Sequence, residues 1–268
     1  MPGDAPDPVT VASRRSLLDA LEVLGPHIQR IVLVGAHAIY LHTEDVVTGV
    51  ALFTKDADLA LIPPLDESPD IDTLMRGARF VEGDQPGIWK HEDGQVDLLV
   101  PDAFAAPVGR RAARLPGHGR PTARKVTGIE GAAVDHDTRA IAALEPGDRR
   151  SARLKVAGPG ALLISKAFKL AERESERGQA RLLDKDAFDA YRLLRLPTAS
   201  LVAGIRRILG DAGTSAIGEA GIEHIRQLFG AADGLGSRLA GRYVERVGEP
   251  ETVRLATAAL TQELLRDL

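Results

Sequence analysis

Two aspartates one residue apart, Asp56 and Asp58, begin the apolar stretch 57–62. In an extended strand, side chains two positions apart point to the same face, so both carboxylates meet at one place. Two unpaired carboxylates there would repel each other, which predicts a cation between them. A third carboxylate, Asp97 in "QVDLLVP", joins the pair if its strand lies beside the first. Three carboxylates that share a site are a standard arrangement for holding two divalent metal ions that bridge a phosphate.

A glycine turn precedes the aspartate pair. The stretch "RIVLVG" predicts a buried strand that stops at Gly35, and a helix is expected over 36–42. Gly35 would let the backbone approach a phosphate closely, because glycine has no side chain. The positive end of the following helix would favour negative charge at the same place.

Two pairs of charged residues fall on predicted helices in the second half, Lys166 with Arg173 and Asp186 with Asp189. Seven residues turn a helix by about 700°, which is close to two full turns, so Lys166 and Arg173 share a face. Three residues turn it by about 300°, so the two aspartates share one as well. A cationic stripe facing the carboxylate site could hold a triphosphate, and the acidic pair could orient those cations.

The order of these motifs resembles a known family. "LVGAHA", "TKDADLAL" and "VDLLV" resemble the nucleotidyltransferase (polymerase-beta-like) fold, whose pattern is a glycine turn, Asp-x-Asp and a distant third Asp. "KAFKLAER" and "DAFD" are similar to the extra motifs K-x6-R and D-x2-D of AbiEii-like toxins of bacterial toxin–antitoxin systems. The resemblance covers roughly residues 31–195.

The resemblance implies a reaction in which a nucleoside monophosphate passes from a nucleoside triphosphate (NTP) to an acceptor hydroxyl and pyrophosphate leaves. Asp56 and Asp58 would hold two Mg²⁺ ions, and Asp97 would bind the second ion and help deprotonate the acceptor. Lys166 and Arg173 would hold the β- and γ-phosphates. The positions that it assigns to nucleotide binding are Gly35, Ala36, Thr54, Lys55, Lys166, Arg173, Asp186 and Asp189. Relatives of this type bind GTP or transfer pyrimidine nucleotides to the 3′ end of transfer RNA (tRNA), which implies a growth-inhibiting toxin with a cognate antitoxin protein.

Segment 107–125, "PVGRRAARLPGHGRPTARK", contains six Arg or Lys and no acid. It predicts a loop or short strand with a positive surface, which suits an RNA acceptor because phosphate contacts supply sequence-independent affinity. The candidate nucleic-acid-binding residues are Arg110, Arg111, Arg114, Arg120, Arg124 and Lys125. The net charge of −4 means that any such contact is local.

The 268 residues predict two domains. Helices and strands alternate over 1–157, which predicts an α+β nucleotidyltransferase domain whose mixed sheet is flanked by helices. Its first element is an amphipathic helix capped by Ser13. Residues 158–268 show helical periodicity throughout and predict a helical domain that carries the K-x6-R and D-x2-D motifs.

Composition narrows the class of protein. The chain has no cysteine, so disulfides, zinc–thiolate sites and cysteine nucleophiles are excluded. No apolar run approaches the length of about 20 residues that spans a bilayer, and the start does not resemble a signal peptide. We therefore expect a cytoplasmic bacterial protein that makes no membrane contact.

Other interpretations stay open. Asp56 and Asp58 alone could be strand-edge residues meeting solvent, Lys166 and Arg173 a solvated helix face, and the D-x2-D pair a helix cap. Among enzymes, a nucleotidyltransferase that acts on a small molecule such as an aminoglycoside is the alternative. A non-catalytic module of the same fold, which binds a nucleotide or a partner, is a third. The sequence Gly35-Ala36, where the family usually has Gly-Gly or Gly-Ser, is its support.

Overall fold

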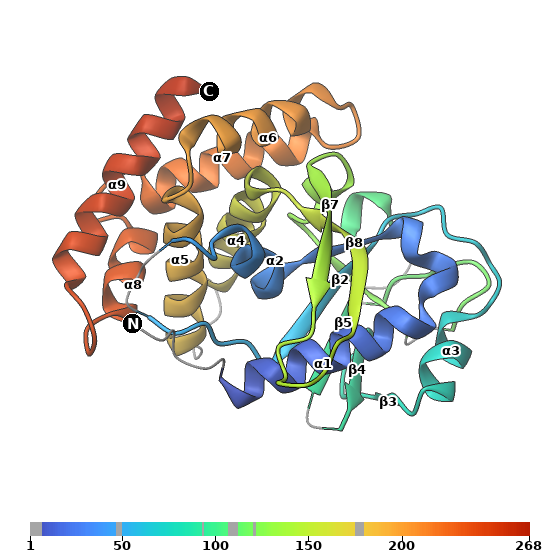
Figure 1. Ribbon diagram of the computed structural model, residues 1–268. Coiled ribbons are helices and arrows are strands. Elements are labelled where there is room, and N and C mark those ends of the chain that lie inside the picture. Colours follow the sequence, from blue (N-terminus) through green and yellow to red (C-terminus); the bar gives the residue numbers. More distant parts are fainter. Residues whose placement is uncertain (1–6, 47–49, 93, 107–111, 120–121, 175–179) are drawn as a thin grey trace. The chain divides into compact units, whose positions relative to one another are not determined.

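The computed structural model describes residues 7–46, 50–92, 94–106, 112–119, 122–174 and 180–268 (Figure 1). The chain divides into two compact units. The sheet unit comprises Met1–Ala38, Ala51–Val126 and His136–Val156, and the helical unit comprises Ile39–Val50, Thr127–Asp135 and Ala157–Leu268. A single boundary near 157 was predicted from the sequence; this division also gives the helical unit two short earlier segments.

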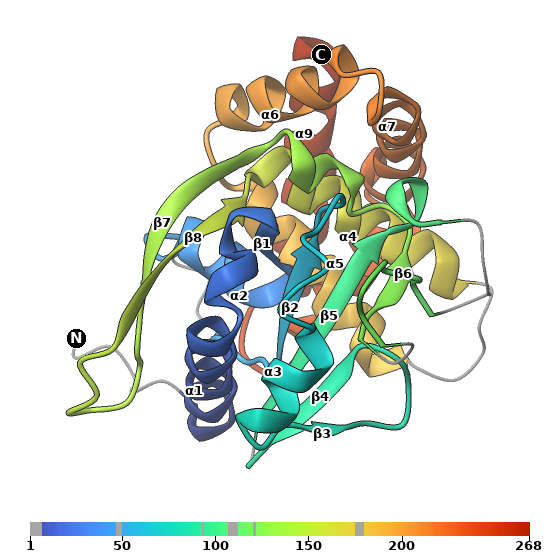
Figure 2. The ribbon, with the colours of Figure 1, turned by 90° about the vertical axis from the view of Figure 1, so that its right-hand side faces the viewer.

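The sheet is mixed, as predicted, and its strand order is β3-β4-β5-β2-β1-β8-β7, with β6 beside β5 (Figure 2). The strands are β1 Ile31–Val34, β2 Asp56–Leu61, β3 Val81–Glu82, β4 Ile88–His91, β5 Gly94–Pro101, β6 Arg124–Val126, β7 His136–Ala142 and β8 Ser151–Ala157. β1 lies between β2 and β8, and all four of its side chains are buried. β4 and β5 form an antiparallel hairpin.

The helical elements that begin or lie in the sheet unit are α1 Pro8–Val23, η1 Gly25–Arg30, α2 Gly35–His42, α3 Ile71–Gly77 and η2 Asp102–Phe104. The predicted cap of the first helix was wrong. α1 begins at Pro8, and the side chain of Asp7 accepts a hydrogen bond from the Val9 N–H, while Ser13 lies inside the helix. Proline at the first helical position has the right φ and lacks an N–H that would have no partner there.

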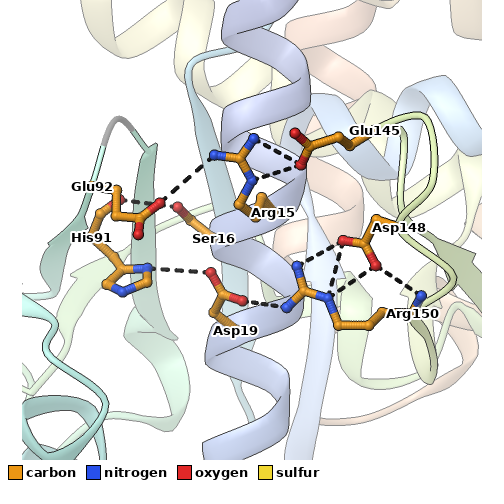
Figure 3. A network of polar contacts seen from close by, with 8 residues as sticks. All are labelled: Arg15, Ser16, Asp19, His91, Glu92, Glu145, Asp148 and Arg150. Carbon is orange, nitrogen blue, oxygen red and sulfur yellow. Dashed lines mark hydrogen bonds and ion pairs between the residues drawn. The ribbon is translucent and has the colours of Figure 1, made fainter.

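α1 packs on β2 and β5 through a buried apolar face that includes Leu17, Leu18 and Leu21. Its polar side is joined to two hairpins (Figure 3). Arg15 donates to Glu145 in the β7–β8 turn, at 2.9 Å. Asp19 lies 3.2 Å from His91 at the end of β4 and also accepts from Arg150. These contacts hold the helix across the strands that carry the carboxylates.

The helical unit contains α4 Pro159–Glu174, α5 Ala180–Leu194, α6 Thr198–Gly210, α7 Ser215–Phe229, α8 Leu235–Tyr243, α9 Pro250–Asp267 and the short turn η3 Glu130–Ala133. This confirms the helical periodicity predicted for the second half. α4 contacts α5, α6 and α7, and α8 lies against α5 and α9. Within the described part of the chain, none of the helices combines the length and apolar character that crossing a membrane requires.

Candidate active site

The three predicted carboxylates lie on adjacent strands of the sheet unit. β2 and β5 run parallel, with Asp58 directly opposite Asp97 and Asp56 opposite Gln95. Residues in register on neighbouring strands, and residues two apart on one strand, share a face of the sheet. Asp56, Asp58 and Asp97 therefore project from one face, which confirms the predicted neighbourhood of the two strands.

Gly35 lies at the end of β1, beside Asp58. Val34 is the register partner of Asp58, and Gly35 has a φ of +67°. A Cβ atom at Gly35 would collide with the Asp58 carboxylate. Glycine is thus required both by the left-handed backbone and by the close approach of this carboxylate. Ala36 follows as a buried residue at the start of α2.

Thr54 positions Asp56. Its hydroxyl lies 3.1 Å from both the carbonyl oxygen and Oδ1 of Asp56, and its N–H donates to Thr10 Oγ1 at 3.0 Å. Thr54 is buried, so its role is to fix the position of Asp56. Lys55 is exposed.

Asp97 is only 3% exposed, and both of its oxygens have partners. Gln95 Nε2 donates to Oδ1 at 2.7 Å, and Arg124 Nη2 donates to Oδ2 at 2.6 Å. Burial raises the pKa of Asp97; the charge of Arg124 and the bond from Gln95 oppose this, whereas the charge of Asp56 adds to it. The carboxylate thus already has one cation beside it.

Sequence reasoning placed Arg124 among RNA contacts and missed its pairing with Asp97. β6 runs parallel to β5 with Arg124 opposite Leu99, so Arg124 shares the face of Leu99 and Asp97. Lys125 lies 3.4 Å from Asp102, and Arg114 is exposed. Three of the predicted basic residues, Arg110, Arg111 and Arg120, lie outside the described residues.

The carboxylates suit Mg²⁺ by their chemistry, because this ion prefers hard oxygen ligands and is usually bound by one or two carboxylates with waters and phosphates. With the side chains in the positions described, no three acidic or histidine residues of the described ranges are gathered as a metal-binding group. At the third carboxylate, Asp97 is paired with Gln95 and Arg124. Asp56 and Asp58 are half-buried on the adjacent strand.

In the helical unit, Lys166 of α4 lies between the two aspartates of α5. Its Nζ atom is 2.6 Å from Asp186 Oδ1 and 2.8 Å from Asp189 Oδ2, and all three residues are buried. The alternatives of a solvated face for Lys166 and a simple cap for the aspartates are therefore wrong. Arg173 lies in α4, and its side chain is outside the described part.

Charge compensation governs this cluster. Burial lowers the pKa of Lys166, but the charges of Asp186 and Asp189 raise it by more, so it stays well above its ordinary value. Burial raises the pKa of both aspartates, but the charges of Lys166 and of the neighbouring lysines, together with the hydrogen bond from Lys166, lower each pKa below its ordinary value. Lys169 and Lys185 add further contacts, at 3.2 Å to Asp186 and 3.1 Å to Asp189. The directions of these shifts keep Lys166, Asp186 and Asp189 ionised at neutral pH.

Tyr40 and Arg192 extend the cluster and were not predicted. Lys185 Nζ lies 5.7 Å and Arg192 Cζ 5.9 Å from the centroid of the Tyr40 ring. Arg192 also donates to the Val50 carbonyl at 2.7 Å. Burial raises the pKa of Tyr40 to about 12. No spacing in the sequence signals these contacts, because they join segments far apart along the chain.

The chain was compared with protein-family models, with curated proteins and with solved structures, and none of these comparisons gave a match.

Proposed function

We propose that this protein is a Mg²⁺-dependent nucleotidyltransferase whose sheet unit has the nucleotidyltransferase fold. It transfers a nucleoside monophosphate from an NTP to an acceptor hydroxyl, with the 3′ end of tRNA as the proposed acceptor. The observation that carries the proposal is the register of β2 and β5, which sets Asp58 opposite Asp97 and puts Asp56 on the same face. Carboxylates on adjacent strands that share one face are a suitable arrangement for holding the ions of phosphoryl-transfer chemistry.

Each residue has a role in this proposal. Asp56 and Asp58 would hold the ions, and Asp97 would complete the site and accept the proton of the attacking hydroxyl. The backbone N–H groups of Gly35 and Ala36 would donate to a phosphate, as the absence of a side chain at Gly35 permits. Mg²⁺, when bound, supplies charge neutralisation at the α-phosphate and at the departing pyrophosphate.

The resemblance assigns Lys166 to the β- and γ-phosphates. Its enclosure by Asp186 and Asp189 favours a positioning role instead, because a phosphate that reached Lys166 would have to displace a buried carboxylate. Lys169 contacts the same Asp186, and its side chain is 44% exposed. Lys169 is therefore better placed than Lys166 to meet an anion in the helical unit, and Arg173 stays a phosphate-binding candidate on the resemblance alone.

With tRNA as acceptor, the protein would act in the cytoplasm as an AbiEii-like toxin, and a cognate antitoxin protein would be its partner. One observation favours the small-molecule alternative. Arg124 and Lys125 are already paired with Asp97 and Asp102, which reduces the positive surface that the described part of segment 107–125 offers to RNA. The acceptor must therefore be tested directly.

The test is transfer of label from each α-³²P-labelled NTP, with Mg²⁺, to total RNA, to protein and to aminoglycosides. The native chain is compared with Asp58→Asn, which keeps the size of the side chain, and with Asp84→Asn, a carboxylate whose side chain is 95% exposed. We expect label in tRNA from the native chain and Asp84→Asn, and a loss of at least about 100-fold for Asp58→Asn. Label in an aminoglycoside would support the alternative acceptor. Equal transfer by Asp58→Asn would overturn the proposal.

A further inference from the structure

The ion pair between Arg124 and Asp97 occupies a position that the proposed function needs. Arg124 Nη2 lies 2.6 Å from Asp97 Oδ2, and the Arg124 side chain is 24% exposed whereas that of Asp97 is 4% exposed. The guanidinium thus covers the third carboxylate from the solvent side. While Arg124 stays in place, it uses one lone pair of that oxygen, and its positive charge opposes a metal ion at the same carboxylate.

Arg124 lies beside Asp97 because β5 pairs with two different strands along the same edge. β5 pairs with β4 along Gly94–Asp97 and then with β6 along Leu99–Pro101. Gly87 lies at the change, with a φ of +79°, and its carbonyl accepts from the Leu98 N–H at 2.7 Å. A Cβ at Gly87 would collide with the Leu98 carbonyl and approach the backbone nitrogen of Arg124 to 2.7 Å. Arg124 therefore begins its strand directly beside the carboxylate site.

The described residues before Arg124 lie beside its strand. Ala113 N–H donates to the Ala123 carbonyl at 3.0 Å, which brings residues 112–113 next to the start of β6. Arg114, the next residue, is exposed. A phosphate that binds here could accept hydrogen bonds from the Arg124 guanidinium in place of Asp97. A guanidinium pairs with carboxylate and with phosphate in similar geometry.

We propose that Arg124 is a latch that exchanges Asp97 for a phosphate of the RNA acceptor, so that acceptor binding opens Asp97 to the metal ion. This inference rests on the proposed function for the metal and for the acceptor. The burial of Asp97 couples the departure of Arg124 to the entry of a metal ion. When Arg124 leaves, Asp97 keeps its hydrogen bond from Gln95 but loses the cation that balances its charge in a site that solvent hardly reaches, which is costly until another cation enters. RNA binding and metal binding therefore favour each other.

The first measurement is the affinity of the full chain for Mn²⁺, a substitute for Mg²⁺, by titration calorimetry. Arg124→Gln removes the latch. Arg153→Gln is the matched control, because Arg153 is an exposed arginine on β8, which β1 and β2 separate from β5. We expect Mn²⁺ to bind Arg124→Gln about 10-fold more tightly than the native chain, and Arg153→Gln to match the native chain. Adding Asp97→Asn to Arg124→Gln should remove the gain.

The second measurement is the affinity for a short fluorescein-labelled RNA ending in CCA, by anisotropy, with and without Mn²⁺. Coupling between two ligands is reciprocal, so Mn²⁺ should tighten RNA binding to the native chain and to Arg153→Gln by about 10-fold. The factor should fall to about 1 in Arg124→Gln, since that variant has no latch to exchange.

The outcomes separate the latch from the proposed function. Equal Mn²⁺ affinity in the native chain and Arg124→Gln, or an equal coupling factor in both, would overturn the latch and leave the metal site standing. Absence of Mn²⁺ binding in both proteins would overturn the proposed function and the latch together. Tighter Mn²⁺ binding that survives Asp97→Asn would show that the gain arises elsewhere, and would also overturn the latch.

Discussion

Lys166 Nζ lies 2.6 Å from Asp186 Oδ1, and both side chains are buried between α4 and α5. The same ammonium group lies 2.8 Å from Asp189 Oδ2. Burying an isolated charge is costly, and each member of this cluster compensates the others. The three residues therefore act as a unit, in which the loss of one changes the energy of the other two.

Removing the ammonium group should destabilise the protein strongly. Lys166→Met keeps the length of the side chain but leaves Asp186 and Asp189 as buried neighbours of like charge. We expect the free energy of unfolding to fall by about 3–5 kcal/mol, measured by urea denaturation. Lys169→Met is the control, since that side chain is 44% exposed, and it should cost less than about 1 kcal/mol. Similar costs for the two variants would contradict the compensation.

The acid dependence of stability follows from the pKa of Asp186. Burial alone would raise this pKa, but the charges of Lys166, Lys169 and Lys185, with the hydrogen bond from Lys166, together lower it well below its ordinary value. A carboxyl with a depressed folded-state pKa contributes stability above its unfolded pKa of about 4, and loses it as the pH falls through the folded value. Asp186→Asn should therefore be less stable than the native chain by about 2–3 kcal/mol at neutral pH, and the gap should narrow below about pH 4. Urea denaturation across this range measures it, and a gap that widens in acid would contradict the sign.

Much of the fold could be predicted from the sequence, because local patterns specify it. The stretches at 31–34 and 94–101 are apolar runs between turn residues, and "EDG" between 88–91 and 94–101 specifies the hairpin. The start of the first helix was missed, because Ser13 was interpreted as its cap. Asp7-Pro8 is nevertheless a capping signal, with a side-chain acceptor followed by a residue that needs no partner for its nitrogen.

The site was predictable only where strand geometry decides it. The alternation of side chains puts Asp56 and Asp58 on one face of their strand. Placing Asp97 beside them required only the further assumption that its strand is adjacent in the sheet. The pairing of Arg124 with Asp97 spans 27 residues and depends on where the short strand β6 lies, which no local pattern specifies. Helical spacing likewise showed that Asp186 and Asp189 share a face, and not that this face is buried against Lys166.

The alkaline dependence of stability should report on Tyr40. Burial raises the pKa of Tyr40 to about 12, so the folded protein keeps this proton at a pH where the unfolded chain loses it. The stability that this retained proton contributes is fully present below the unfolded pKa of about 10, and it is lost as the pH rises through the folded pKa. Tyr40→Phe has no such proton, so its unfolding free energy should fall less steeply above pH 10 than that of the native chain. Equal slopes in urea denaturation would contradict the assignment.

The partly exposed network on α1 should contribute little, despite its many contacts (Figure 3). Asp19 pairs with His91 and Arg150, and the Arg150 side chain is 40% exposed. Exposed ion pairs typically contribute less than about 1 kcal/mol, and salt screens them. Asp19→Asn should lower the free energy of unfolding by about 0.5 kcal/mol at low salt, and by less in about 1 M NaCl. A loss that grows with salt would contradict an electrostatic origin.

A buried carboxylate also holds the start of α4. Asp135 is fully buried; its Oδ2 accepts from the Ala161 N–H at 2.8 Å, and its Oδ1 accepts from Arg207 at 2.5 Å. Three glycines surround it, and a Cβ at Gly204 would lie 2.6 Å from Asp135 Oδ2. Because two donors fix the carboxylate, it cannot move aside for an added methyl group.

The same substitution at two positions of α6 should therefore have opposite effects. Alanine favours a helix over glycine by up to about 1 kcal/mol, and Gly210 has no atom within 4 Å of an added Cβ, so Gly210→Ala should be neutral or slightly stabilising. At Gly204 the collision with Asp135 outweighs this gain, and Gly204→Ala should lower the free energy of unfolding by about 1–3 kcal/mol. Adding Asp135→Ala to Gly204→Ala removes the collision, so the two losses should not add. Additive losses in urea denaturation would show that the glycine is required for another reason.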